Sequence, residues 1–556
     1  MKCLHRRRPV ALRGFVEVWF QITLGALQTA ATGTLAWYHW RAGVELPQAE
    51  AELKAAGYSL DVVENASTDV PDEGNFGATE PIKDIATREA DQTPEIKERL
   101  AVLRALNMYK RPVERDLNGV PVPDLPQNGR VELKNVPGGP VNRPQQKELR
   151  MPDLSGEIDW PACREWIANG LKWEVPRDEV DPAQAVLTAL RLRMEPIYPA
   201  LLAAAQNRKH AAWTPGQRTR FKETVQRGDV VLEFFTVGGS FMPLLRIIQL
   251  RQEAALACGM EEVAADLTKV LFSCSDLCVN ETSLINFLVR ITMDQMIFDA
   301  ARRSLSEGRL NAALLAEYQM FFAARPYVDQ FERAMQMELA AGHYMMTQIV
   351  DQKISLDEIK SVFGLSDMDR YKVLASPLTQ GITKVFFDLG RARHIRHHLA
   401  GLQALKSGGF PGLFRWAKEF ENSRRTGPLD ALLPGFLLSI MTASSYSGLM
   451  PGVAYKEMSR RAFIVECALE RHRLAGGATP DKLSSVPKEL LAEVPLDLDG
   501  QPIRYRRVKN AFVLWSVGLD LEDEVKADEP LYPPKEPVRT SDQYLNSDWR
   551  WWHLDP

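Results

Sequence analysis

The chain has few cysteines and no excess of basic residues. Six cysteines are scattered over 556 residues, which is too few for the disulfide framework of a small secreted domain. The formal net charge is −4, so no basic face is expected and nucleic acid is not expected as a partner. The sequence also lacks a phosphate-binding loop, a nucleophile elbow and a His-Glu-x-x-His motif. These absences favour a protein that is not an enzyme and carries no cofactor.

What the chain does have is a basic N-terminus followed by a mostly apolar run with aromatic residues at both ends. The basic residues that precede any acidic one are Lys2, Arg6, Arg7, Arg8 and Arg13. About twenty apolar residues span a bilayer core, and indole rings favour the headgroup level. We therefore expect a single-pass transmembrane anchor over residues 14–40 that contacts the lipid bilayer. The basic stub 1–13 is then cytoplasmic, and the rest of the chain is extracytoplasmic.

Polar residues interrupt this run and leave two other interpretations open. Glu17, Gln21 and Gln28 cost free energy inside a membrane unless a partner helix satisfies them. Small residues at 31–33 and 34–36 are compatible with a cleaved signal peptide. The third interpretation is a buried helix of a soluble protein. Only this last one keeps the bulk of the chain inside the cytoplasm.

Helical spacing of apolar residues dominates the middle of the chain, which we assign to an α-helical domain over residues 153–476. The clearest helical segments are 183–205, 242–258, 261–278, 284–303, 310–324, 328–349, 367–406, 413–421, 432–441 and 451–474. Short connections that contain glycine join several of them as antiparallel hairpins. The predicted fold is mainly α, either a helical bundle or a short helical-hairpin solenoid.

Two segments of different composition flank this domain. Residues 41–152 are predicted to form a short helix, with Pro47 in its first turn, and a proline-rich connector. Apolar residues of the connector, among them Phe76 and Ile82, provide a surface that docks on a folded body.

Residues 477–556 are predicted to form a small β-containing C-terminal subdomain. Alternating side chains indicate a β-hairpin made of residues 503–507 and 511–517. Trp549 and Trp551 share one face of a further strand that is able to pair with this hairpin. A contact with a partner or a membrane surface is the alternative role for these tryptophans.

The segment from about 460 to 524 carries a family resemblance. It has a helix ending at 468–474, a turn at Asp499-Gly500 before Pro502, and the closing stretch 516–520, Ser-Val-Gly-Leu-Asp. This order resembles the C-terminal module of the major pseudopilins of type II secretion systems. It is also similar to large, uncharacterised bacterial single-pass membrane proteins with a helical middle. The resemblance implies a location at the bacterial inner (cytoplasmic) membrane rather than a catalytic activity.

The resemblance also suggests a calcium site and a processing site. Acidic residues that follow the closing stretch help to hold calcium in pseudopilins, and the corresponding residues here are Asp520, Glu522, Asp523 and Glu524. The glycines that follow in the family are missing, so a solvated acidic turn is the competing interpretation. The stretch 13–18 resembles a prepilin cleavage site, and cleavage after Gly14 would indicate a component of a pseudopilus-like assembly.

His394, His397 and His398 form the densest histidine group and are candidate ligands for zinc or copper. Arginines surround them, and no carboxylate has the helical spacing of a third ligand. The pattern therefore favours a basic solvated face with one half-buried histidine. The alternative function that uses this cluster is metal-assisted hydrolysis.

The expected function is a non-catalytic one, because no assembled catalytic set accompanies the helical hairpins. We predict a signal-anchored extracytoplasmic protein that serves as a scaffold or interacts with another protein at the cell envelope. The identity of that protein partner does not follow from the residues.

Overall fold

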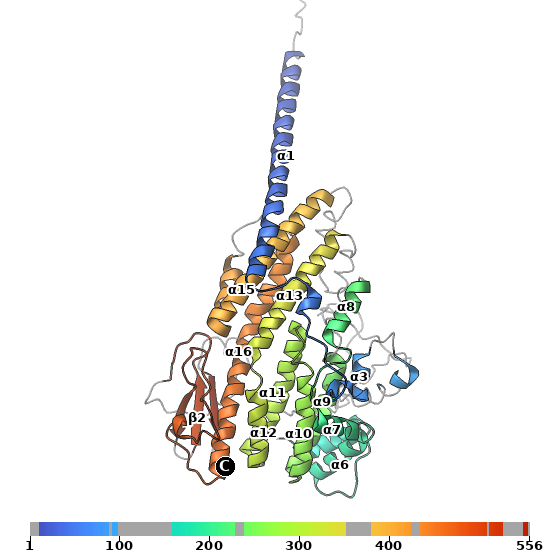
Figure 1. The fold of residues 1–556 in the computed structure, drawn as a ribbon, viewed down its shortest axis with the longest axis vertical. Coiled ribbons are helices and arrows are strands. Elements are labelled where there is room, and N and C mark those ends of the chain that lie inside the picture. The colour runs from blue at the N-terminus through green and yellow to red at the C-terminus, as the bar shows by residue number, and fades with distance from the viewer. Residues whose placement is uncertain are drawn as a thin grey trace, which may run out of the picture.

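The computed structural model describes residues 10–87, 92–97, 100, 158–227, 238–351, 380–423, 434–508, 511–525 and 549–553. Long helices lie side by side in the body of the molecule, a small sheet covers one edge, and the first helix extends away from the body (Figure 1). The prediction of a mainly α fold with β structure near the C-terminus is confirmed.

Helix α1 (Val10–Ala55) runs without interruption through the boundary expected between the anchor and a separate short helix. Its C-terminal turns pack on α15 (Gln380–Ser423), where Ala49 and Leu53 form a buried cluster with residues that include Ile395. The N-terminal turns extend clear of the body (Figure 1). In the described part of the chain, no helix combines the length and the apolar character that crossing a membrane requires.

The body is built from long helices close to the expected ones. They are α9 (Gly238–Ala257), α10 (Glu261–Asp276), α11 (Leu284–Ser306), α12 (Ala312–Ala323), α13 (Tyr327–Val350), α15 and α16 (Pro434–Leu474). The connections from α9 to α10 and from α11 to α12 turn at Gly259 and Gly308, with φ angles of 70° and 66°. Glycine adopts this left-handed backbone without a steric penalty. Ser283 caps α11 and Asn311 caps α12 through their side-chain oxygens.

Proline and glycine explain the differences from the predicted helices. The segment 183–205 is two helices, α6 (Pro182–Met194) and α7 (Tyr198–Asn207), because Pro196 lies in the turn between them and cannot donate a backbone hydrogen bond. The expected break near residue 410 is present, since Gly409 in α15 has non-helical angles (φ 57°, ψ −153°). The two segments expected at 432–441 and 451–474 belong to the single helix α16, which contains Pro451.

Shorter elements connect these helices. They are α2 (Val62–Asn65), η1 (Phe76–Ala78), α3 (Glu80–Ala86), α5 (Trp160–Glu165), η3 (Trp166–Gly170), α8 (Gln217–Arg227) and η8 (Leu483–Ser485). The described start of the connector docks as expected, because Phe76 and Ile82 are fully buried. Asn75 Oδ1 also accepts a hydrogen bond from the backbone of Ala212 at 2.9 Å. The rest of the predicted connector, residues 101–152, lies outside the described residues.

The C-terminal strands form a three-stranded antiparallel sheet in the order β1 (Arg504–Val508), β2 (Ala511–Ser516) and β3 (Trp549–His553). The predicted hairpin and its pairing with the tryptophan strand are both confirmed, with Leu514 opposite Trp551. Trp549 and Trp551 are buried and pack on Tyr455 of α16. The sheet therefore shares one hydrophobic core with the helices.

A buried carboxylate on α16 joins several elements. Glu457 is fully buried and accepts two hydrogen bonds from Arg460, at 2.9 and 2.7 Å, and one from Arg461 at 2.8 Å. It also accepts from the backbone N–H of Tyr327, at the start of α13, at 3.3 Å. Arg461 in turn donates to the carbonyl of Leu496 at 2.7 Å, in the segment that leads to the sheet. Burial opposes the charge, but the two arginines outweigh it and lower the pKa of Glu457 to about 2.

Candidate functional site

Helices α13 and α15 bring three histidines into their contact. His394 and His398 of α15 are 0% and 1% exposed, with ring centroids 4.2 Å apart. His343 of α13 is buried beside Arg391, with 2.9 Å between His343 Nε2 and an arginine Nη. His397 packs its ring on Phe420, at 4.2 Å between centroids. The expectation of one half-buried histidine is therefore wrong, because two members of the predicted cluster are enclosed in the core.

The enclosure depends on a glycine. A Cβ atom at Gly342 of α13 would lie 2.6 Å from Nε2 of His394, which is far inside a normal contact. The absence of a side chain lets the imidazole approach the helix backbone, where His394 Nε2 lies 3.3 Å from the carbonyl oxygen of Leu339. The close approach of α13 to α15 is thus set by one small residue on one helix and one ring on the other.

Burial keeps these imidazoles neutral. Desolvation lowers the pKa of His394 well below its ordinary value, with His398 as the second cause. It lowers the pKa of His398 to about 4 and that of His343 to about 3, where Arg391 adds to the effect. A neutral imidazole is the form that binds a metal. However, no three histidine, cysteine or carboxylate side chains gather to hold a metal ion anywhere within the described ranges.

The C-terminal acidic residues surround an arginine. Asp497 and Asp499 each lie 2.6 Å from the guanidinium of Arg504, and Asp523 lies 3.5 Å from its Nε. Asp497 is buried and also accepts hydrogen bonds from the backbone N–H groups of Leu498 and Val517, at 2.7 and 3.0 Å.

Of the four acidic residues named as candidate calcium ligands, Asp523 belongs to this group. Asp520 is exposed and accepts from the backbone of its own turn, at Glu522 N. The Arg504 guanidinium lowers the pKa of Asp499 by hydrogen bonding, whereas burial raises that of Asp497. The Arg504 guanidinium therefore already pairs with the carboxylates of Asp497, Asp499 and Asp523.

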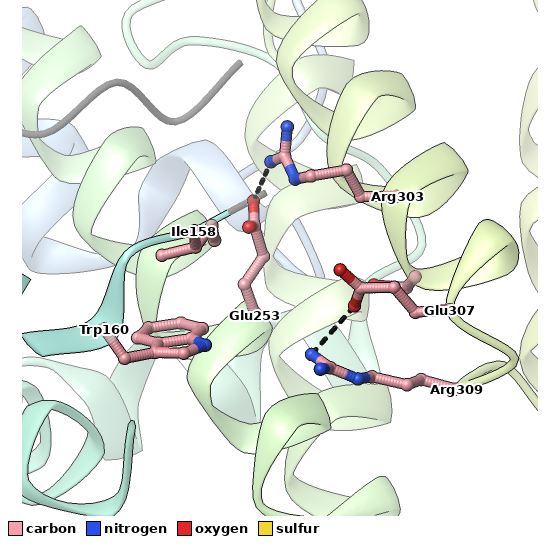
Figure 2. Close-up of a pocket in the computed structure, with 7 residues that line it drawn as sticks. Ile158, Trp160, Glu253, Arg303, Glu307 and Arg309 are labelled. Atoms are coloured by element: carbon pink, nitrogen blue, oxygen red, sulfur yellow. Dashed lines mark hydrogen bonds and ion pairs between the residues drawn. The ribbon is translucent and has the colours of Figure 1, made fainter. Parts of the chain in front are cut away.

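A polar pocket lies where α5, α9 and the C-terminal end of α11 meet. Trp160 and Ile158 form one side, and Glu307 and Arg309 form the other, with the carboxylate of Glu253 between them (Figure 2). Because α9 is packed on both α6 and α11, its residue Glu253 has a side chain that is only 4% exposed. The pocket thus combines an aromatic wall with charges of both signs.

Two ion pairs occupy this pocket at different depths. The inner pair joins Arg303 to Glu253 Oε1 at 2.7 Å, and Gln249 donates to the same oxygen at 3.0 Å. The outer pair joins Arg309 to Glu307 at 2.9 Å, with both side chains about one-third exposed. Burial raises the pKa of Glu253, and Arg303 only partly opposes that shift.

This pocket is not evident from the sequence, because Glu253 and the charged residues of 303–309 come from separate segments of the chain. One feature within the sequence pointed to it. Glu253 is followed by Ala254, Ala255 and Leu256 within an apolar helical segment, so a carboxylate there is expected to need a buried partner. No family model, curated protein or solved structure matches this chain.

Proposed function

We propose that this protein is a membrane-attached scaffold of the bacterial inner membrane. In this proposal α1 carries the attachment, and the helical body offers a surface to a protein partner on the extracytoplasmic side. One observation carries the proposal. The C-terminal turns of α1 are fixed to α15, while its N-terminal turns extend beyond the body (Figure 1).

Exposed aromatic side chains at the end of the predicted anchor support the attachment. Trp37 and Trp40 are 48% and 65% exposed, and Val44 is 45% exposed. Trp37 packs on Tyr38, with 4.8 Å between ring centroids, and the Arg41 guanidinium lies 5.1 Å from the Trp37 ring. Indole rings next to a cationic side chain are typical of the headgroup level of a bilayer.

A fixed junction between α1 and the body supports a scaffold role. Ala42 packs with Val385 and Leu389 of α15, and about two and three turns later Ala49 and Leu53 pack on the same helix. Polar contacts flank this apolar seam, where Arg396 lies 3.5 Å from Glu45 and 3.3 Å from Glu52. Such partly exposed pairs each contribute about 0–1 kcal/mol, so apolar burial supplies most of the stability of the junction.

The test is membrane fractionation of the full chain expressed in a bacterial host, followed by alkaline carbonate extraction. We expect the protein to stay with the membrane, and protease added to intact spheroplasts should remove an epitope at the C-terminus. Replacing Trp37 and Trp40 together by serine should weaken retention of the chain, because both side chains would leave the interface. Met320→Ser is a matched control, since Met320 is 66% exposed on the body.

Recovery of the full chain in the carbonate supernatant would refute the attachment. Mass spectrometry of the retained protein distinguishes the remaining alternative for the same segment. An intact N-terminus agrees with a retained signal-anchor, whereas an N-terminus that begins after Gly14 would instead indicate a pseudopilus-like component.

A further inference from the structure

The pocket between α5, α9 and α11 has unused hydrogen-bonding capacity on a buried charge. Arg303 and Gln249 both donate to Oε1 of Glu253, and no donor among the described residues reaches the second oxygen, Oε2. Oε2 of Glu253 remains open to the pocket, and two buried nitrogens of the neighbouring Arg303, Nε and Nη1, also lack a hydrogen-bond partner among the described residues. A polar group on a buried charge costs free energy unless water or a ligand pairs with it. The pocket therefore has a place for a donor of a bound molecule beside Glu253.

The charges around the pocket define the kind of molecule. Two acidic residues, Glu253 and Glu307, and two basic ones, Arg303 and Arg309, line it, so their formal charges sum to zero. A ligand with a net charge would leave that charge uncompensated in a partly enclosed site. A ligand that carries one positive and one negative group can pair both and remain neutral overall.

The size of the pocket limits the ligand further. It offers about 70 Å³ to the centres of water-sized atoms, about half of the roughly 150 Å³ that holds a ring of six carbon atoms in an engineered cavity. The space therefore suits only a molecule of a few non-hydrogen atoms, part of which extends toward the open side of the pocket. Free glycine and alanine are among the smallest molecules that carry both an ammonium and a carboxylate, and both groups are attached to the same carbon, Cα.

We propose that this pocket binds a small free α-amino acid. Its ammonium group donates to Glu253 Oε2 and to Glu307, and its carboxylate accepts from Arg309. Its Cα and side chain lie against Trp160 and Ile158, opposite the outer ion pair (Figure 2). The ligand can separate Glu307 from Arg309 at little cost, because an exposed ion pair contributes only about 0–1 kcal/mol of stability. The inner pair stays in place and holds Glu253.

Isothermal titration calorimetry of the full chain tests the proposal with four probes: glycine, L-alanine, methylamine and acetate. We expect glycine or L-alanine to bind at least about tenfold more tightly than methylamine or acetate, which each present only one of the two charged groups. Absence of binding by both amino acids would overturn the proposal. Equal binding of methylamine would overturn it as well, because a simple cation site would then explain the pocket.

Two variants locate the binding within the pocket. Glu307→Gln and Arg309→Gln each remove one charge at the rim, and we expect each to weaken amino-acid binding at least about tenfold with an unchanged melting temperature. Glu262→Gln is the matched control, since Glu262 is exposed on the neighbouring helix α10, and it should bind like the wild type. Unaltered binding by the Glu307 variant would contradict the assignment. These results do not depend on whether α1 attaches to a membrane.

Discussion

Replacing the buried carboxylate of Glu457 by an amide should destabilise the protein strongly. The pKa of Glu457 is lowered from 4.5 to about 2, and each pKa unit corresponds to about 1.36 kcal/mol between the two protonation states. The ionised form therefore contributes about 3 kcal/mol of stability at pH 7. Glu457→Gln keeps the shape but removes the charge, and it leaves Arg460 and Arg461 without their anion. We expect the free energy of unfolding to fall by about 3 kcal/mol.

Urea denaturation followed by far-UV circular dichroism measures this difference as a function of pH. A group with a lowered pKa contributes its full stability above its unfolded pKa and loses it as the pH falls toward the folded pKa. The difference between the wild type and Glu457→Gln should therefore narrow to about 1–1.5 kcal/mol at pH 3. Glu262→Gln, on the exposed face of α10, should change stability by less than about 0.5 kcal/mol. A loss below about 1 kcal/mol for Glu457→Gln at pH 7 would refute the reasoning.

Three further perturbations test the contacts described above. Gly342→Ala should lower stability by about 1–3 kcal/mol, because its Cβ meets His394 Nε2 at 2.6 Å. Gly448→Ala, with open space at its Cβ, should stabilise slightly in a thermal melt. Burial lowers the pKa of His398 from 6.5 to about 4. The free energy of unfolding of the wild type should therefore fall by about 3 kcal/mol as the pH drops from 6.5 to below 4. His398→Gln should show a shallower loss in urea titrations over that range. Arg504→Ala should lower the melting temperature, and added calcium should restore part of the loss in this variant but leave the wild type unchanged. A wild type that calcium stabilises would contradict the role given to Arg504.

Local patterns predicted most of the elements, because capping residues, glycine turns and apolar spacing act within a few residues of one another. The helices from α9 to α13 and the hairpin of β1 with β2 are examples. Proline was harder to interpret. Pro196 divides two helices, whereas Pro451 lies inside α16, and a short window of sequence does not contain the tertiary packing that holds such a helix together.

The contacts between helices could not be predicted from the sequence. His394 of α15 is enclosed because Gly342 of α13 has no side chain and permits a close approach of the two helices. Nothing in the sequence around either residue indicates that the two meet. The pocket likewise depends on a contact between two helices, since Glu253 comes from α9 and Arg303 from α11. Arg504 among the aspartates was likewise unexpected, because the resemblance directed attention to the acidic residues and to calcium rather than to a cation already present in the chain.

The junction between α1 and α15 has a mechanical consequence. The two helices run in the same direction along their shared seam, since Ala42 clusters with Val385 and Leu389, and the later residues Ala49 and Leu53 cluster with Ile395 and Leu399. A force that pulls on the projecting end of α1 would load this seam in shear. All of its contacts would then resist the force at the same time. A pull across the seam would break them one after another instead. The body is thus suited to withstand tension along the axis of its first helix.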